Sequence, residues 1–96
     1  MSYSYQVERP KLFTEAGQRT FITVRDTVRV LLDKAGAFQS MNAGRDLKGY
    51  DAWELLACLD LMVERGELRY VQGPENAAGQ DWTYIAGPKW RNGVGG

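Results

Sequence analysis

Residues 51–71 read DAWELLACLDLMVERGELRYV and carry a helix signal followed by a strand signal. Asp51 is a residue type that caps helices, and Gly66 is of the type that ends them. Between these two positions the apolar residues recur at helical spacing and form one face: Ala52, Leu55, Leu56, Leu59, Met62 and Val63. The stretch therefore predicts a helix over residues 51–65, a stop at Gly66 and a strand over residues 67–71.

A second long helix is predicted upstream, over residues 15–35. Thr14 suits the N-cap position, and Glu15 places a carboxylate in the first turn, where it interacts favourably with the helix dipole. Gly36 lies where a glycine in the left-handed conformation commonly ends a helix. The residues that form the expected core face of this helix are Phe21, Val24, Val28, Leu31, Leu32 and Ala35.

Shorter elements are predicted around these two helices. Residues 37–39 have strand character, and residues 40–47 are expected to form a short helix capped by Ser40 and followed by a tight turn. Residues 67–71 and 82–85 read as two strands joined by a loop rich in turn formers. The chain thus predicts an α+β domain with three helices and a C-terminal β-hairpin.

Both ends of the chain are expected to lie outside this domain, which spans residues 14–86. Residues 1–13 begin with an alternation that points Tyr3, Tyr5 and Val7 to one side, which is the period of a strand. We interpret residues 1–13 as an edge strand or an arm that covers the body of the domain; an arm that binds a partner is the alternative. Residues 87–96 have few apolar side chains and are expected to form a flexible tail.

The composition argues against several classes of protein. The chain has 96 residues, no histidine, one cysteine, and 12 basic against 12 acidic residues. The lack of histidine removes Ser-His-Asp and Cys-His catalysis and every histidine-containing metal site, and Cys58 alone cannot form a disulfide or a four-cysteine zinc site. No apolar run is long enough for a membrane span, and no signal-peptide pattern is present. We expect a cytoplasmic protein that is not an enzyme and binds no cofactor, metal or membrane.

The passage from Leu59 to Leu68 resembles a motif of winged helix-turn-helix domains. It is similar to the sequence L-x-x-L-x-x-x-G-x-(apolar), at which the third helix of such domains turns into the wing. Leu59 and Met62 match the core positions, Gly66 the helix stop and Leu68 the first inward wing residue. The third helix and wing also resemble those of small winged-helix proteins from phages and prophages, whose activity is not settled. The resemblance implies this fold over residues 14–86 and a phage or prophage setting.

The same resemblance implies DNA binding through the third helix, but the outer side of that helix is unsuited to it. The residues opposite its core face are Trp53, Glu54, Ala57, Asp60, Leu61 and Glu64. Helices that read the major groove usually carry hydrogen-bond donors there, because phosphates repel carboxylates. Four acidic residues and one arginine give the helix a net charge of −3. Major-groove readout by this helix is therefore disfavoured.

Trp53, Ala57 and Leu61 are spaced four residues apart and form an apolar stripe bordered by Glu54, Asp60 and Glu64. An apolar patch with a polar border is typical of a protein contact, in which tryptophan is often a dominant residue. We predict a winged-helix module that acts through this stripe, with Tyr3 and Tyr5 at its rim. The contact would form a homodimer, or recruit or inhibit a nucleic-acid or defence machine. The alternatives are that the chain's own N-terminal arm covers the stripe, or that its exposure has no role.

The sequence has features of two further candidate functions. The first is a DNA-binding transcriptional regulator that uses basic and aromatic residues around the turn, wing and tail: Arg45, Lys48, Arg69, Lys89, Trp90 and Arg91. The second is a carboxylate enzyme, which would require Asp46, Asp51 and Glu54 to converge in one pocket. No paired acidic motif supports the enzyme.

Overall fold

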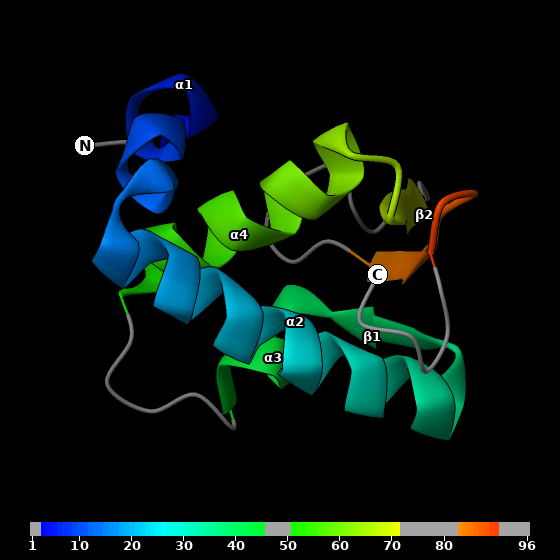
Figure 1. Ribbon diagram of the computed structural model, residues 1–96. Coiled ribbons are helices and arrows are strands. Elements are labelled where there is room, and N and C mark those ends of the chain that lie inside the picture. The colour runs from blue at the N-terminus through cyan, green and yellow to red at the C-terminus, as the bar shows by residue number, and fades with distance from the viewer. Residues whose placement is uncertain (1–2, 46–50, 72–82, 91–96) are drawn as a thin grey trace.

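The computed structural model describes residues 3–45, 51–71 and 83–90. In these residues the chain forms four α-helices, one 3-10 helix and a three-stranded antiparallel sheet, which confirms the predicted α+β class (Figure 1). The elements are, in order, α1 (Tyr5–Glu8), η1 (Arg9–Phe13), α2 (Glu15–Ala35), β1 (Ala37–Gln39), α3 (Ser40–Arg45), α4 (Ala52–Glu64), β2 (Leu68–Val71) and β3 (Thr83–Ala86).

Helix α2 begins and ends where the sequence predicts. The Thr14 hydroxyl accepts a hydrogen bond of 3.0 Å from the Gly17 amide, as an N-cap does. At the other end, Gly36 has a φ of 76° and donates its amide hydrogen to the Leu32 carbonyl at 2.8 Å. The buried apolar residues of α2 are Phe21, Val24, Val28 and Leu32, whereas Leu31 is half-buried and Ala35 is exposed.

Helix α4 is capped as predicted but is buried on two sides. Asp51 accepts a hydrogen bond of 2.8 Å from the Trp53 amide, and Gly66 follows the helix with a φ of 79°. The buried residues of α4 are Leu55, Ala57, Cys58, Leu59, Leu61 and Met62. The predicted single core face is therefore wrong in part, since Ala52 is exposed and Leu56 and Val63 are only half-buried. The side of α4 that includes Ala57 and Leu61 is covered by residues 3–13, which are described below.

The sheet has the order β1-β3-β2, so the last of the described strands lies in its middle. Tyr84 of β3 is opposite Phe38 of β1 and Tyr70 of β2. The ring of Tyr84 lies 5.3 Å from each of the two neighbouring rings, and its side chain is buried. The predicted hairpin strands are confirmed, and the loop between them lies outside the described residues. Figure 1 shows the sheet at the opposite end of the molecule from α1.

The predicted N-terminal strand is wrong, because residues 5–13 form α1 and η1. Pro10 lies in the first turn of η1, where the missing amide hydrogen costs no helical hydrogen bond. Residues 3–13, called here the N-terminal segment, pack against both α2 and α4. The approach to α2 is so close that a Cβ atom on Gly17 would lie 2.2 Å from the Lys11 carbonyl oxygen.

The first four residues of the predicted flexible tail are also packed, which corrects that prediction for residues 87–90. The amides of Gly87 and Lys89 each donate a hydrogen bond of 2.9 Å, to the carbonyls of Glu67 and Gly66 respectively. Trp90 is half-buried against the core. Residues 91–96 lie outside the described part of the chain, as do residues 46–50, so the predicted short helix is confirmed only as far as Arg45.

Candidate functional site

The outer side of α4 is covered by the N-terminal segment. Ala57 is 0% exposed and Leu61 is 3% exposed, and Trp53 is half-buried. The Tyr3 ring meets the Trp53 ring edge-on, with 6.5 Å between the centroids. The predicted apolar stripe is therefore not an open surface, because the chain's own N-terminal arm folds over it. Burial of the stripe inside the molecule removes its apolar area from water without a partner.

Asp60 of α4 joins the N-terminal segment to the sheet. Its Oδ2 atom accepts a hydrogen bond of 2.6 Å from the Tyr3 hydroxyl, and its Oδ1 atom accepts one from the Tyr70 hydroxyl. Burial, and then the hydrogen bond to the Asp60 carboxylate, raise the pKa of both tyrosines well above the ordinary value. Both hydroxyls thus stay protonated and can keep donating to Asp60 at neutral pH.

Glu64 forms a second anchor one helical turn further on. Its two carboxylate oxygens accept hydrogen bonds of 2.9 and 2.7 Å from Nε and Nη2 of Arg9, and Oε1 accepts another of 2.8 Å from the Tyr5 hydroxyl. The hydrogen bonds from Arg9 and Tyr5 lower the pKa of Glu64 to about 2. Burial and the bond to Glu64 raise the pKa of Tyr5 to about 12. Asp60 and Glu64, two acidic residues on the outer side of α4, therefore already have hydrogen-bond partners within the chain.

No family model, curated protein or solved structure matches the chain. The likeness to winged helix-turn-helix domains therefore depends on the motif at residues 59–68 and on the order of the elements.

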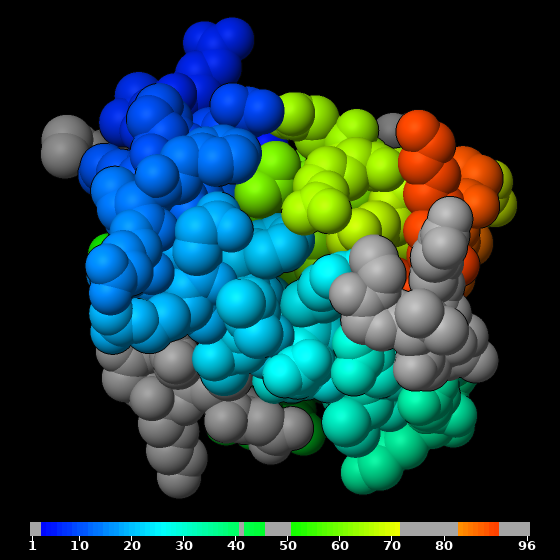
Figure 2. Space-filling model, in the orientation of Figure 1, coloured from blue at the N-terminus to red at the C-terminus, as the bar shows by residue number. Residues whose placement is uncertain are grey.

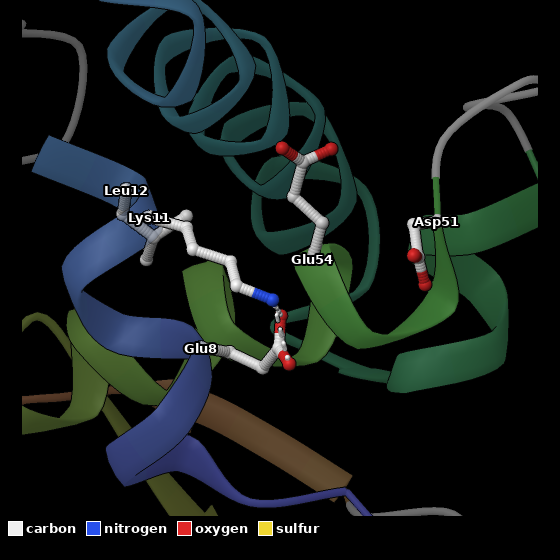
Figure 3. Close-up of a pocket in the computed structure, with 5 residues that line it drawn as sticks. All are labelled: Glu8, Lys11, Leu12, Asp51 and Glu54. Carbon is white, nitrogen blue, oxygen red and sulfur yellow. Dashed lines mark hydrogen bonds and ion pairs between the residues drawn. The ribbon is translucent and has the colours of Figure 1, made fainter. Parts of the chain in front are cut away.

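A pocket of about 280 Å³ lies between η1 and the first turn of α4 (Figure 3). It is lined by Glu8, Lys11, Leu12, Asp51 and Glu54. Lys11 Nζ lies 3.3 Å from both carboxylate oxygens of the buried Glu8, whereas the Glu54 carboxylate points away from this pair. Three carboxylates and one ammonium give the lining a net charge of −2, which favours a cationic group.

The carboxylates of the hypothetical enzyme are only partly assembled. Asp51 and Glu54 line the same pocket, while Asp46 lies outside the described residues. In the part of the chain that the structure describes, no three histidine, cysteine or acidic residues are grouped to hold a metal ion. Cys58 lies in the core, where burial, followed by the nearby Glu54 charge, raises its thiol pKa to about 12. None of the described helices is long and apolar enough to cross a membrane.

The basic residues singled out for DNA binding do not form one described patch. Arg45 is exposed at the end of α3, whereas Arg69 and Lys89 are exposed on β2 and just beyond β3. Figure 1 shows α3 and β2 apart in the molecule. The aliphatic part of Lys89 lies against Gly66, and Trp90 packs on the core. Lys48 and Arg91 lie outside the described residues.

Four residues of the site were not anticipated as parts of it: Glu8, Arg9, Lys11 and Tyr70. Tyr70 was assigned only to a strand, because its link to Asp60 depends on the turn between α4 and β2. Pro10 was the available signal for the helical start, since proline is favoured in the first turn of a helix. A helical N-terminal segment would have placed Glu8 and Lys11 close together, three residues apart on one face.

Proposed function

We propose that the chain is a winged helix-turn-helix module that acts by binding another protein. Helix α4 corresponds to the third helix of such a module, and we propose that it does not read DNA. The winged-helix assignment is supported by the succession of long helix, short strand, short helix, third helix and hairpin. The proposal also includes a non-enzymatic role and a phage or prophage origin, which are supported by the sequence alone.

The state of α4 argues against a groove-reading role. A recognition helix must present its outer side to base edges. Here that side is occupied by Tyr3, and the charges at its border are carboxylates, of which Glu64 is already paired with Arg9. Entry of α4 into a groove would require release of the N-terminal segment and would then bring acidic side chains close to phosphates.

The observation that carries the protein-binding proposal is the exposed apolar surface of the N-terminal segment. While this segment covers α4, it presents Val7 and Phe13 to solvent, with 60% and 56% of each residue exposed. Arg9 Cζ lies 5.0 Å from the centre of the Phe13 ring, which adds a charged border. Three residues of the same segment, Glu8, Lys11 and Leu12, also line the anionic pocket. We therefore place the protein contact on the N-terminal segment and not on the covered stripe of α4.

Affinity capture with three forms of the protein tests this surface. We expect the wild type and a Val71→Ser control to retain the same partner, because Val71 is an exposed valine on β2. A Val7→Ser, Phe13→Ser variant should lose this partner and keep the wild-type circular dichroism spectrum. The proposal is wrong if all three forms retain the same proteins.

DNA binding is the second candidate, supported by Arg45, Arg69 and Lys89, which form no ion pair with another described residue. A labelled random duplex titrated by fluorescence anisotropy over a salt series separates the two functions. We expect no binding at low salt. Tight binding that weakens steeply with salt, and that an Arg69→Ala, Lys89→Ala variant loses, would replace the protein-binding proposal with the regulator.

A further inference from the structure

Helix α2 has an apolar and charged outer face that packs on no described element. Its 21 residues cross the front of the molecule, and Figure 2 shows most of this face open to the viewer. The face is formed by six exposed residues on the side opposite the buried residues of α2: Glu15, Arg19, Ile22, Asp26, Val30 and Asp33. Ile22 is 57% exposed and Val30 is 52% exposed.

Ile22 and Val30 are not explained by the stability of the helix itself. β-branched residues are poorer helix formers than alanine, leucine, lysine or glutamate, because the preceding turn restricts their side chains. At exposed positions that disadvantage is not compensated by burial within one molecule. Both residues lie four positions from Asp26, one on each side, so they flank the centre of the same face.

The charges of this face are complementary under a twofold rotation. When two copies of α2 pack antiparallel, the two Asp26 residues lie at the centre of the contact. Each residue that precedes Asp26 in one copy then meets the residue that follows Asp26 by the same number of positions in the other copy. Arg19 then meets Asp33, and Ile22 meets Val30, twice in each dimer. A parallel pair would instead bring Arg19 to Arg19 and Asp33 to Asp33, which is repulsive.

The negative charge at the centre of such a dimer has to be compensated by a positive charge, which each helix supplies. Two Asp26 carboxylates would approach each other, but Arg29 Nη1 lies 3.6 Å from Asp26 Oδ1 within each helix. Arg19 is bonded to Glu15 in its own helix, with 73% and 86% of the two side chains exposed. Ion pairs this exposed contribute little, so Arg19 can exchange Glu15 for an Asp33 carboxylate of the other copy.

From this pattern we infer that the outer face of α2 binds a second copy of the chain in an antiparallel, twofold-symmetric dimer. The inference deepens the proposed protein-binding function by naming one partner, and it uses a different surface from Val7 and Phe13. A contact along one face of a single helix pair is smaller than a standard interface of about 800 Å² per partner. We therefore expect a weak dimer whose population depends on protein concentration.

Sedimentation equilibrium of the whole chain, from about 10 µM to about 1 mM, tests the dimer. The wild type should pass from monomer to dimer over this range, and Ile22→Glu should weaken dimerisation at least about tenfold, because it places a charge at the apolar contact. Val71→Glu is the matched control, since Val71 is also an exposed valine but lies on β2, outside both proposed surfaces. It should dimerise as the wild type does.

Charge reversal tests the orientation. Arg19→Asp and Asp33→Arg should each weaken the dimer, and the double variant should restore it, because the reversed pair is again complementary. A monomer at every concentration overturns the dimer, as does equal weakening by Ile22→Glu and Val71→Glu. A double variant weaker than both single variants overturns the antiparallel arrangement. None of these results alters the capture experiment with Val7 and Phe13, so failure of the dimer is distinguishable from failure of the proposed function.

Discussion

The hydroxyl of Tyr3 lies 2.6 Å from Oδ2 of Asp60, although 57 residues separate them in the chain. The opposite oxygen of the same carboxylate accepts from Tyr70. A single side chain of α4 thus connects the start of the described chain with strand β2. This arrangement makes Asp60 a structural residue, where the sequence suggested part of a binding border.

Replacement of Asp60 by alanine should destabilise the protein by about 1–3 kcal/mol, because it leaves two partly buried hydroxyls without their acceptor. Urea unfolding followed by circular dichroism measures the change. Glu54→Ala is the control, since Glu54 is a half-buried carboxylate on the same helix and has no hydrogen bond to another described residue. It should shift stability by less than about 0.5 kcal/mol. Equal losses in the two variants would contradict the role of Asp60.

Acid should weaken the anchoring of the N-terminal segment through Glu64. The pKa of Glu64 is lowered from 4.5 to about 2 in the folded protein. A lowered carboxyl pKa stabilises the fold above the unfolded value, and this contribution is lost as the pH falls from about 4.5 towards 2. The melting temperature of the wild type should therefore fall more steeply over this range than that of Glu64→Gln. Parallel curves would show that Glu64 does not contribute. Added salt should reduce the difference, because the Glu64 side chain is exposed.

Gly17→Ala should be strongly destabilising, although alanine is the better helix former. The new methyl group would lie 2.2 Å from the Lys11 carbonyl oxygen and 2.6 Å from Leu12 Cα, and backbone atoms cannot move aside cheaply. We expect a loss of about 1–3 kcal/mol, measured by thermal unfolding. Gly44→Ala in α3 is the matched change, since its methyl group meets only the end of the Leu55 side chain at 3.1 Å. A Gly17 variant as stable as the Gly44 variant would show that the N-terminal segment does not pack on α2.

Cys58 should not react with thiol reagents in the folded protein. Its side chain is 0% exposed and its thiol pKa is raised to about 12, so the reactive thiolate is scarce and inaccessible. Labelling with a chromogenic disulfide at neutral pH should be slow without denaturant and rapid in urea. Rapid labelling of the native protein would show that the core around α4 opens readily.

The parts of the fold that were predicted correctly have local signals. Thr14 and Gly36 delimit α2, and Asp51 and Gly66 delimit α4, because caps act on the adjacent turn of backbone. Only the strand interpretation of the N-terminal segment was wrong, because alternating tyrosines have the same period as a strand. Its helical form is stabilised by contacts with Asp60 and Glu64, which no local pattern reveals.

The α4 residues of the candidate site and its two rim tyrosines were predicted, whereas the structure shows that the α4 stripe is covered instead of forming an open surface. Trp53, Ala57 and Leu61 do lie on one side of α4, as the helical period requires. Whether that side faces solvent depended on the path of residues 3–13, which is set by tertiary contacts. The exposure of Val7 and Phe13 could likewise be recognised only from the structure, because it depends on the path of the same segment.

The position of β3 in the middle of the sheet has a consequence for folding during synthesis. Among the described strands, β1 and β2 each pair only with β3, so neither has this neighbour before residues 83–86 have been translated. The helices and the N-terminal segment can associate on the ribosome, whereas strand pairing must wait until β3 has left the exit tunnel. A nascent chain stalled before residue 83 would therefore leave the edges of two strands unpaired and open to association with other chains.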